Sequence, residues 1–143
     1  MNILFYQIVL ALIIIIFSLI LSVQDIKHME VGLYIQWLSI ICALVCHLIF
    51  ARTEMWIYIL SSLIMGSFYF AVRKITKDKL GPADVWFGFF QGLFLMPVYI
   101  SVCLGVEVVA VLVIVNKRLG RQKFPFIPYM SFGLIVSYIL QII

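Results

Sequence analysis

Long apolar runs separated by short polar links make up most of the chain. The first two runs cover residues 3–23 and 31–51, and residues 25–30 link them. A third run covers residues 55–72, and a fourth, longer run covers residues 85–116. About 20 consecutive apolar residues are enough for a helix to cross the hydrocarbon core of a bilayer. Each run therefore predicts a membrane-spanning helix, and the uncharged start of the chain indicates a permanent span rather than a cleaved secretion signal.

The run at residues 85–116 is too long for one crossing. As a single helix its 32 residues would extend about 48 Å, whereas the hydrocarbon core is about 30 Å thick. Pro97 disrupts a helix at its position, so we expect two short helices that meet at residues 96–101. The final run covers residues 124–143, and its helix is expected to begin near Pro128 because proline favours the first helical turn. The pattern thus predicts an all-α fold with six transmembrane helices.

The composition supports a membrane protein. Of the 143 residues, 66% are hydrophobic and 11% are charged, and the mean hydropathy is +1.23. A soluble fold of this size lacks the interior volume to bury so much apolar surface. The composition therefore excludes an ordinary soluble enzyme, a disordered chain and a disulfide scaffold. It predicts one transmembrane domain that covers residues 1–143.

The basic residues indicate how the helices are oriented. Nine of the ten lysines and arginines fall in links that six crossings place on one side, at residues 25–30, 73–79 and 117–123. The tenth is Arg52, on the other side. By the positive-inside rule the three links are cytoplasmic and both termini are extracytoplasmic, in a multi-pass protein of the cell membrane. The net charge of +4 then reflects orientation rather than a nucleic-acid partner, and the basic links are suited to contact anionic membrane lipid.

Two aspartates lie at the cytoplasmic boundary in this topology. Asp25 follows one crossing and Asp84 follows three, so both lie on the same face of the membrane. Of two carboxyl groups held close together, one keeps its proton while the other acts as a base toward water, as in aspartic proteases. Two alternatives stay open. Asp25 could be a solvated residue beside Lys27, and Asp84 could belong to an ordinary helix start that opens with Pro82.

The helix that follows Asp84 is expected to pack closely against another helix. Gly88 and Gly92 are one turn apart, and this spacing of small residues lets a second helix approach. At helical periodicity one face carries five residues in all: Asp84, Gly88, Gln91, Gly92 and Leu95. We therefore expect a second helix to lie against this face, close to the carboxyl group.

Glu107 is the single charged residue of the long run at residues 85–116. In the expected topology it lies near the middle of the membrane, where a charge is costly and commonly serves a function. The alternative is a structural role, in which a neutral carboxyl group forms a hydrogen bond with Gln91, Gln36 or His47 across the bundle. We favour the structural role.

The cysteines give no sign of a metal site or a disulfide framework. Cys42, Cys46 and Cys103 all lie inside apolar runs, where free thiols usually pack as small hydrophobic groups. Cys42 and Cys46 lie near His47 on one expected helix, but these are too few ligands for a zinc site. The sequence therefore predicts neither a metal nor a cofactor.

The first aspartate lies in a stretch that resembles the type IV prepilin peptidases and the archaeal preflagellin peptidases, which are membrane aspartyl proteases with a GxGD motif. In that family an aspartate after the first span begins a stretch of the form D-x5-[IV]-P. Here Asp25 is followed in register by Val31, and Gly32 stands in place of the proline. The resemblance extends over nearly the whole chain, and its motifs follow one another in the order found in the family.

Two further stretches match the family in part. The GxGD motif at the start of the fourth span corresponds to residues 81–84, Gly-Pro-Ala-Asp, with Ala83 in place of the second glycine. Trp86 stands where the family often has a lysine. A Pro-Phe-x-Pro stretch that opens the last span corresponds to residues 125–128.

The resemblance implies that Asp25 and Asp84 are the catalytic pair. It also implies a set of residues that shape the site and bind substrate: Gly81, Ala83, Gly88, Gly92, Pro125 and Pro128. The implied reaction removes a short basic leader from prepilin-like precursors (pilins, pseudopilins or flagellin-like proteins) at the cytoplasmic face of the membrane. Many bacterial members also carry a cytoplasmic segment with paired cysteines and N-methyltransferase activity. That segment is missing here, so we expect a peptidase-only form.

A second class of protein stays open beside the peptidase. In a non-catalytic membrane subunit, such as a transporter component or an assembly factor, the aspartates would cap helices and Glu107 would line a path. Substitution of either aspartate separates the two classes, because a peptidase then loses cleavage while it keeps its insertion in the membrane.

Overall fold

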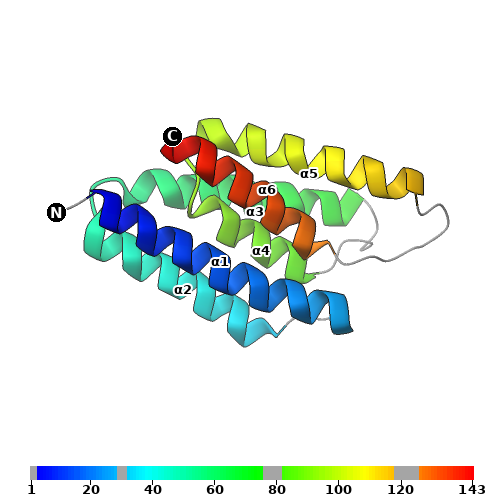
Figure 1. The fold of residues 1–143 in the computed structure, drawn as a ribbon, viewed down its shortest axis with the longest axis horizontal. Helices are drawn as coiled ribbons and strands as arrows, with labels where there is room; N and C mark the ends of the chain where they lie inside the picture. Colours follow the sequence, from blue (N-terminus) through cyan, green and yellow to red (C-terminus); the bar gives the residue numbers. More distant parts are fainter. Residues whose placement is uncertain (1–2, 29–31, 76–81, 118–125) are drawn as a thin grey trace.

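Helices account for nearly all of the residues that the structure describes. The computed structural model describes residues 3–28, 32–75, 82–117 and 126–143. Six helices follow one another in these ranges: α1 (Ile3–His28), α2 (Leu33–Phe50), α3 (Met55–Ile75), α4 (Pro82–Gly92), α5 (Pro97–Lys117) and α6 (Ile127–Ile142). The described residues contain no strand, so the all-α prediction is confirmed for this part of the chain (Figure 1).

Three of the helices are long and apolar enough to cross a membrane. By length and composition α1, α2 and α3 meet this requirement, with 26, 18 and 21 residues. Large apolar side chains face outward along them, such as Leu19, Leu38 and Leu63, which are 60%, 53% and 54% exposed. A soluble protein rarely exposes apolar surface on this scale. These observations indicate a membrane protein.

The first helix is longer than the apolar pattern predicts. α1 continues through Asp25 to His28, whereas the apolar run ends at Val23. A helix satisfies its backbone hydrogen bonds within its own turns, so it continues past the apolar run to a position where Lys27 and His28 favour its C-terminal end. Asp25 therefore lies on a helix and not in the polar link that the sequence predicts.

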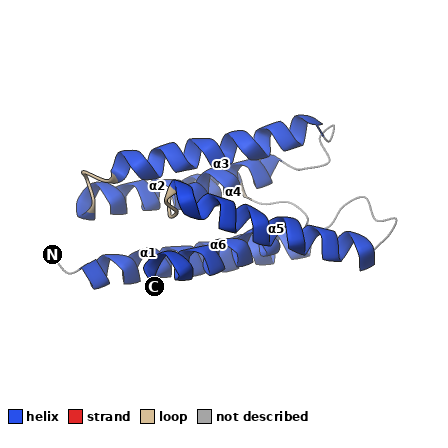
Figure 2. Ribbon diagram, turned by 90° about the horizontal axis from the view of Figure 1, so that it is seen from above, coloured by secondary structure: helices blue, strands red, loops and turns tan. Residues whose placement is uncertain are grey.

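The helices pack in two layers with a short helix at the core. Figure 2 shows α1 and α6 in one layer and α2 and α3 in the other. α4 packs most extensively against α3 and also contacts α2 and α6. Seven of its 11 residues are buried, and Phe87 and Phe90 among them are essentially inaccessible. The core of the protein therefore surrounds α4.

α4 is too short to cross a membrane by itself. Its 11 residues extend about 16 Å, which is roughly half the thickness of the hydrocarbon core. Residues 93–96 form a turn, and α5 begins at Pro97 and has 21 residues. The predicted division into two helices is confirmed, but α5 is not short and the turn precedes Pro97. Proline accounts for this position, because it fits a first helical turn and disfavours a helical residue before it.

The two ends of the bundle differ in character. In Figure 1 both chain termini lie at one end, and the end of α1 and the starts of α4 and α6 lie at the other. The last turns of α1 and α3 carry the basic residues Lys27, His28, Arg73 and Lys74 at this second end, which we call the basic end.

Candidate functional site

Asp25 joins α1 to the start of α6. Its side chain is buried, with 7% exposed, and its Oδ2 accepts a hydrogen bond from the backbone N–H of Ile127 at 3.0 Å. Ile127 is the first residue of α6, and Phe126 at the N-cap position makes no side-chain capping bond. The first N–H groups of a helix lack partners within the helix. Asp25 therefore caps α6 from a different helix and is held in one orientation by it.

Asp84 is the third residue of α4, and 9% of it is exposed. The helix begins with Pro82, whose fixed backbone angle suits this position. The carbonyl of Ala83 accepts a hydrogen bond from Nε2 of Gln36 on α2, at 3.0 Å. α2 thus holds the start of α4, and an acidic side chain in this first turn is favoured by the helix dipole.

Both aspartates belong to the basic end of the bundle, because Asp25 lies in the last turn of α1 and Asp84 in the first turn of α4. Figure 1 shows these two helix ends at the same end of the bundle. α6, whose first N–H group binds Asp25, contacts α4 as well as α1. Tyr69 of α3 links these elements further, because its ring contacts Phe126 with 6.2 Å between centroids and also packs against Gly88 of α4. The structure therefore places both carboxyl groups, buried, at the same end of one packed unit.

Gly88 and Gly92 let α3 and α4 approach closely. A Cβ atom added to Gly88 would lie 2.5 Å from Cδ2 of Tyr69, and one added to Gly92 would collide with the backbone of Ser62. The predicted close packing is confirmed, and its partner is α3. The five positions do not share one partner helix, because Gln91 bonds residues of α5 and α6. Leu95 lies beyond the helix and does not extend its face. A central helix has neighbours on several sides, so nearby positions reach different partners.

The remaining predicted site residues have separate roles or positions. Pro128 lies in the first turn of α6, and Ala83 is half-buried in the first turn of α4. Gly81 and Pro125 lie outside the described residues. Trp86 contacts the ring of Trp37 at a centroid distance of 5.9 Å. An aromatic contact therefore joins the first part of α4 to α2.

Glu107 forms a buried polar cluster away from the basic end. Nε2 of Gln91 donates hydrogen bonds to Oε1 of Glu107 and, at 2.7 Å, to the carbonyl of Met130. Sγ of Cys103 also donates to Oε1 of Glu107, at 3.3 Å. Of the three predicted partners, Gln91 is the one that bonds Glu107, and this polar cluster joins α4, α5 and α6. Among the described residues Oε2 of Glu107 and Oε1 of Gln91 have no hydrogen-bond partner.

His47 has a role that sequence reasoning missed. Its Nε2 bonds the carbonyl of Leu93, and its Nδ1 lies 2.6 Å from the hydroxyl of Tyr6. A carbonyl oxygen only accepts, so Nε2 carries the hydrogen. The ring also stacks on Tyr58, with 4.4 Å between centroids and 15° between planes. His47 therefore connects α1, α2 and α3 to the turn after α4.

Gln141 acts on the same turn from α6. Its Nε2 donates to the carbonyl of Phe94 at 2.9 Å, and its Oε1 accepts from the N–H of Met96 at 2.7 Å. The turn expected inside the apolar run is the sequence signal for such residues. Its backbone groups must find partners within the protein, so polar side chains of other helices are candidates.

The described residues contain no group of three or more His, Cys, Asp and Glu side chains that could hold a metal ion. Cys42, Cys46 and Cys103 are free thiols.

Comparison of the chain with protein-family models, curated protein sequences and solved structures found no match. The fold defines the class as a helical membrane protein. Any assignment of activity rests on the arrangement of Asp25 and Asp84.

Proposed function

We propose that the protein is a membrane aspartyl endopeptidase of the prepilin-peptidase type. It removes the short basic leader from prepilin-like precursors at the cytoplasmic face of the membrane. One observation carries the proposal: Asp25 and Asp84, 59 positions apart in the chain, are both buried at the basic end. The order of the motifs along the sequence supports the same class.

In the proposed mechanism the two carboxyl groups share one proton. The ionised carboxylate takes a proton from a water molecule, and the water oxygen bonds to the carbonyl carbon of the scissile peptide. The other carboxyl group gives its proton toward the carbonyl oxygen as this tetrahedral intermediate forms. When the C–N bond breaks, the leaving amine takes a proton from the pair. The Ile127 N–H bond to Asp25 supports this role, because it fixes the orientation of one carboxyl group.

The proposed topology has six crossings with both termini outside the cytoplasm. The positions of the termini at one end and of the basic residues at the other support it (Figure 1). The fourth crossing combines α4 with the non-helical residues 93–96, because α4 alone is too short. The basic end then lies at the cytoplasmic surface, next to anionic lipid headgroups.

The second candidate is a non-catalytic membrane subunit. It rests on the capping bond between Asp25 and Ile127, because an aspartate that caps a helix has a structural purpose even without catalysis. The two candidates make opposite predictions for the isosteric amide. Asparagine keeps an oxygen that accepts the N–H of Ile127, but it cannot take up the proton of a water molecule.

Co-expression with a candidate prepilin-like protein tests the proposal. Asp25→Asn and Asp84→Asn should each abolish the mobility shift of the substrate, while the protein remains in the membrane at the wild-type level. Asp78→Asn and Glu107→Gln serve as controls and should cleave normally. Asp78 is a carboxyl residue of the basic link at residues 73–79, outside the described residues, and has no part in the proposed pair. Retained cleavage in either of the first two variants would overturn the aspartyl mechanism. Absence of cleavage by the wild-type protein would favour the non-catalytic subunit.

A further inference from the structure

We propose that hydrogen bonds at the C-terminal end of α4 position Asp84 at its other end. His47 and Gln141 are then positioning residues for the aspartate pair. The catalytic consequence of this inference rests on the proposed function. The mechanical coupling along α4 is independent of that function.

α4 connects the two locations as a rigid element. Asp84 lies in the first turn of α4, and Gly92 is its last residue, about 12 Å away along the axis. Backbone hydrogen bonds between successive turns make a helix of this length move as a unit. A shift or rotation at Gly92 therefore moves Asp84 relative to Asp25, which belongs to α1.

The turn that follows α4 depends on other helices for part of its hydrogen bonding. The carbonyl groups of Phe90 and Gln91 accept hydrogen bonds from N–H groups of the turn itself. The carbonyl groups of the turn need partners elsewhere, because the interior of a membrane offers no water. Leu93 and Phe94 are 2% and 0% exposed. Their carbonyl groups accept hydrogen bonds from His47 and Gln141. These two side chains therefore determine where the end of α4 can rest.

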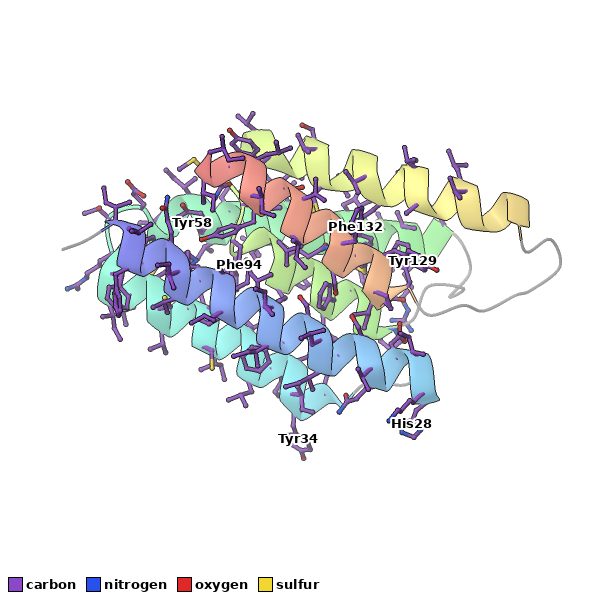
Figure 3. All side chains as sticks on the ribbon, viewed as in Figure 1. His28, Tyr34, Tyr58, Phe94, Tyr129 and Phe132 are labelled. Carbon is purple, nitrogen blue, oxygen red and sulfur yellow. The ribbon has the colours of Figure 1, made fainter. Side chains whose placement is uncertain are left out.

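Both positioning side chains are themselves fixed. The ring of His47 is held by the hydroxyl of Tyr6 and by stacking on Tyr58. The amide of Gln141 is held by the N–H of Met96. Figure 3 shows Tyr58 and Phe94 in the part of the bundle that lies away from His28, which marks the basic end. The hydrogen bonds that support the end of α4 are therefore remote from the aspartates, and none of them involves Asp25 or Asp84.

Ser62 supplies a third contact of the same kind. Its hydroxyl donates to the carbonyl of Phe89 on α4 at 2.6 Å. Ser137 is a matched control, because its hydroxyl is also buried and donates at 2.7 Å to a carbonyl, that of Gly133 in its own helix. Ser137 also forms a hydrogen bond with Cys103 of α5, and this bond is absent from every variant of a chain whose cysteines are replaced. In that chain, loss of the Ser62 bond acts on α4, whereas loss of the Ser137 bond acts within α6.

A distance measurement between spin labels tests the coupling without any substrate. The labels are attached at Lys27→Cys and Trp86→Cys, each two residues from an aspartate, in a chain whose native cysteines are replaced by alanine. The parent should give one narrow distance distribution. His47→Phe, which keeps an aromatic ring but no N–H donor, and Gln141→Leu should shift or broaden it. Ser62→Ala should do so to a smaller extent, and Ser137→Ala should not.

The catalytic consequence is tested with the same variants by the rate of cleavage of a co-expressed prepilin-like protein. A misplacement of about 1 Å can cost about 100-fold in rate, so His47→Phe should lower kcat by about 10–100-fold with little change in KM. His47→Gln, whose amide restores an N–H donor, should recover most of the rate and the narrow distribution.

The outcomes separate this inference from the proposed function. An unchanged distance distribution in His47→Phe, Gln141→Leu and Ser62→Ala would overturn the coupling, even if the wild-type protein cleaves its substrate. A changed distribution in a protein that cleaves nothing would support the coupling and overturn the peptidase assignment. If His47→Phe does not fold, Ser62→Ala against Ser137→Ala decides the question.

Discussion

Two regions of the protein bury carboxyl groups in different surroundings. At the basic end, Asp25 receives a backbone N–H group from the start of a helix. Away from it, Glu107 is 2% exposed and receives hydrogen bonds from the side chains of Gln91 and Cys103. Burial is similar in both regions, so burial alone does not distinguish a candidate catalytic carboxyl group from a structural one. The groups that donate hydrogen bonds to each carboxyl group do distinguish the two, because they determine which interactions a substitution removes.

Gly92→Leu should have the largest effect on stability, because Gly92 lies in the packed unit that joins the two regions. The added side chain would collide with the backbone of Ser62, which cannot move aside as a flexible side chain can. We expect a loss of more than about 3 kcal/mol or a failure to fold. Denaturant titration in detergent micelles, followed by circular dichroism, measures the effect. Gly105→Leu is the control, because a Cβ atom at Gly105 meets nothing within 4 Å.

Substitution of Glu107 should have an intermediate effect on stability and should sharpen the comparison between the two regions. Glu107→Leu removes the acceptor for Gln91 and Cys103 and should destabilise the protein by about 1–3 kcal/mol. Glu107→Gln keeps an oxygen in place and should cost less than about 1 kcal/mol. The same titration measures both variants. Equal losses for the two would show that the charge of Glu107, and not its hydrogen bonds, stabilises the cluster.

The smallest effect on stability is expected at Asp25. Asp25→Ala removes a cap from α6 and should cost about 1 kcal/mol. Asp25→Asn should cost only a few tenths of that amount, because an amide oxygen still accepts the N–H of Ile127. Denaturant titration of the two variants provides the values. A large loss in Asp25→Asn would mean that the negative charge stabilises the basic end, which would make Asp25 resemble a structural ion more than a catalytic base.

The sequence predicts the helices because each apolar run must lie in the membrane as a regular hydrogen-bonded element. It also predicts a hydrogen bond between Glu107 and one of three side chains, and the structure identifies Gln91 as the partner. Few polar side chains occur in the apolar runs, so a buried carboxyl group has few partners available. The glycine spacing predicts the close packing of α4, though it does not identify α3 as the partner.

The remaining features depend on information that the pattern does not contain. The extension of α1 past Val23 follows from local backbone bonding, which apolar periodicity does not report. The bond between His47 and Leu93 joins positions 46 apart and depends on how α2 lies against α4. The place of Asp25 at the start of α6 likewise depends on the packing of α1 against α6.

The buried turn at residues 93–96 has a consequence for the order in which the chain is made. His47 is synthesised before the turn, so the carbonyl of Leu93 has its partner as soon as α4 reaches α2. Gln141 belongs to α6, which follows the turn in the chain, and it serves both Phe94 and Met96. These two backbone groups therefore have no partner in Gln141 until α6 has been synthesised and packed. The hairpin of α4 and α5 is completed only when α6 joins the bundle, which makes the docking of this helix a late step in membrane assembly.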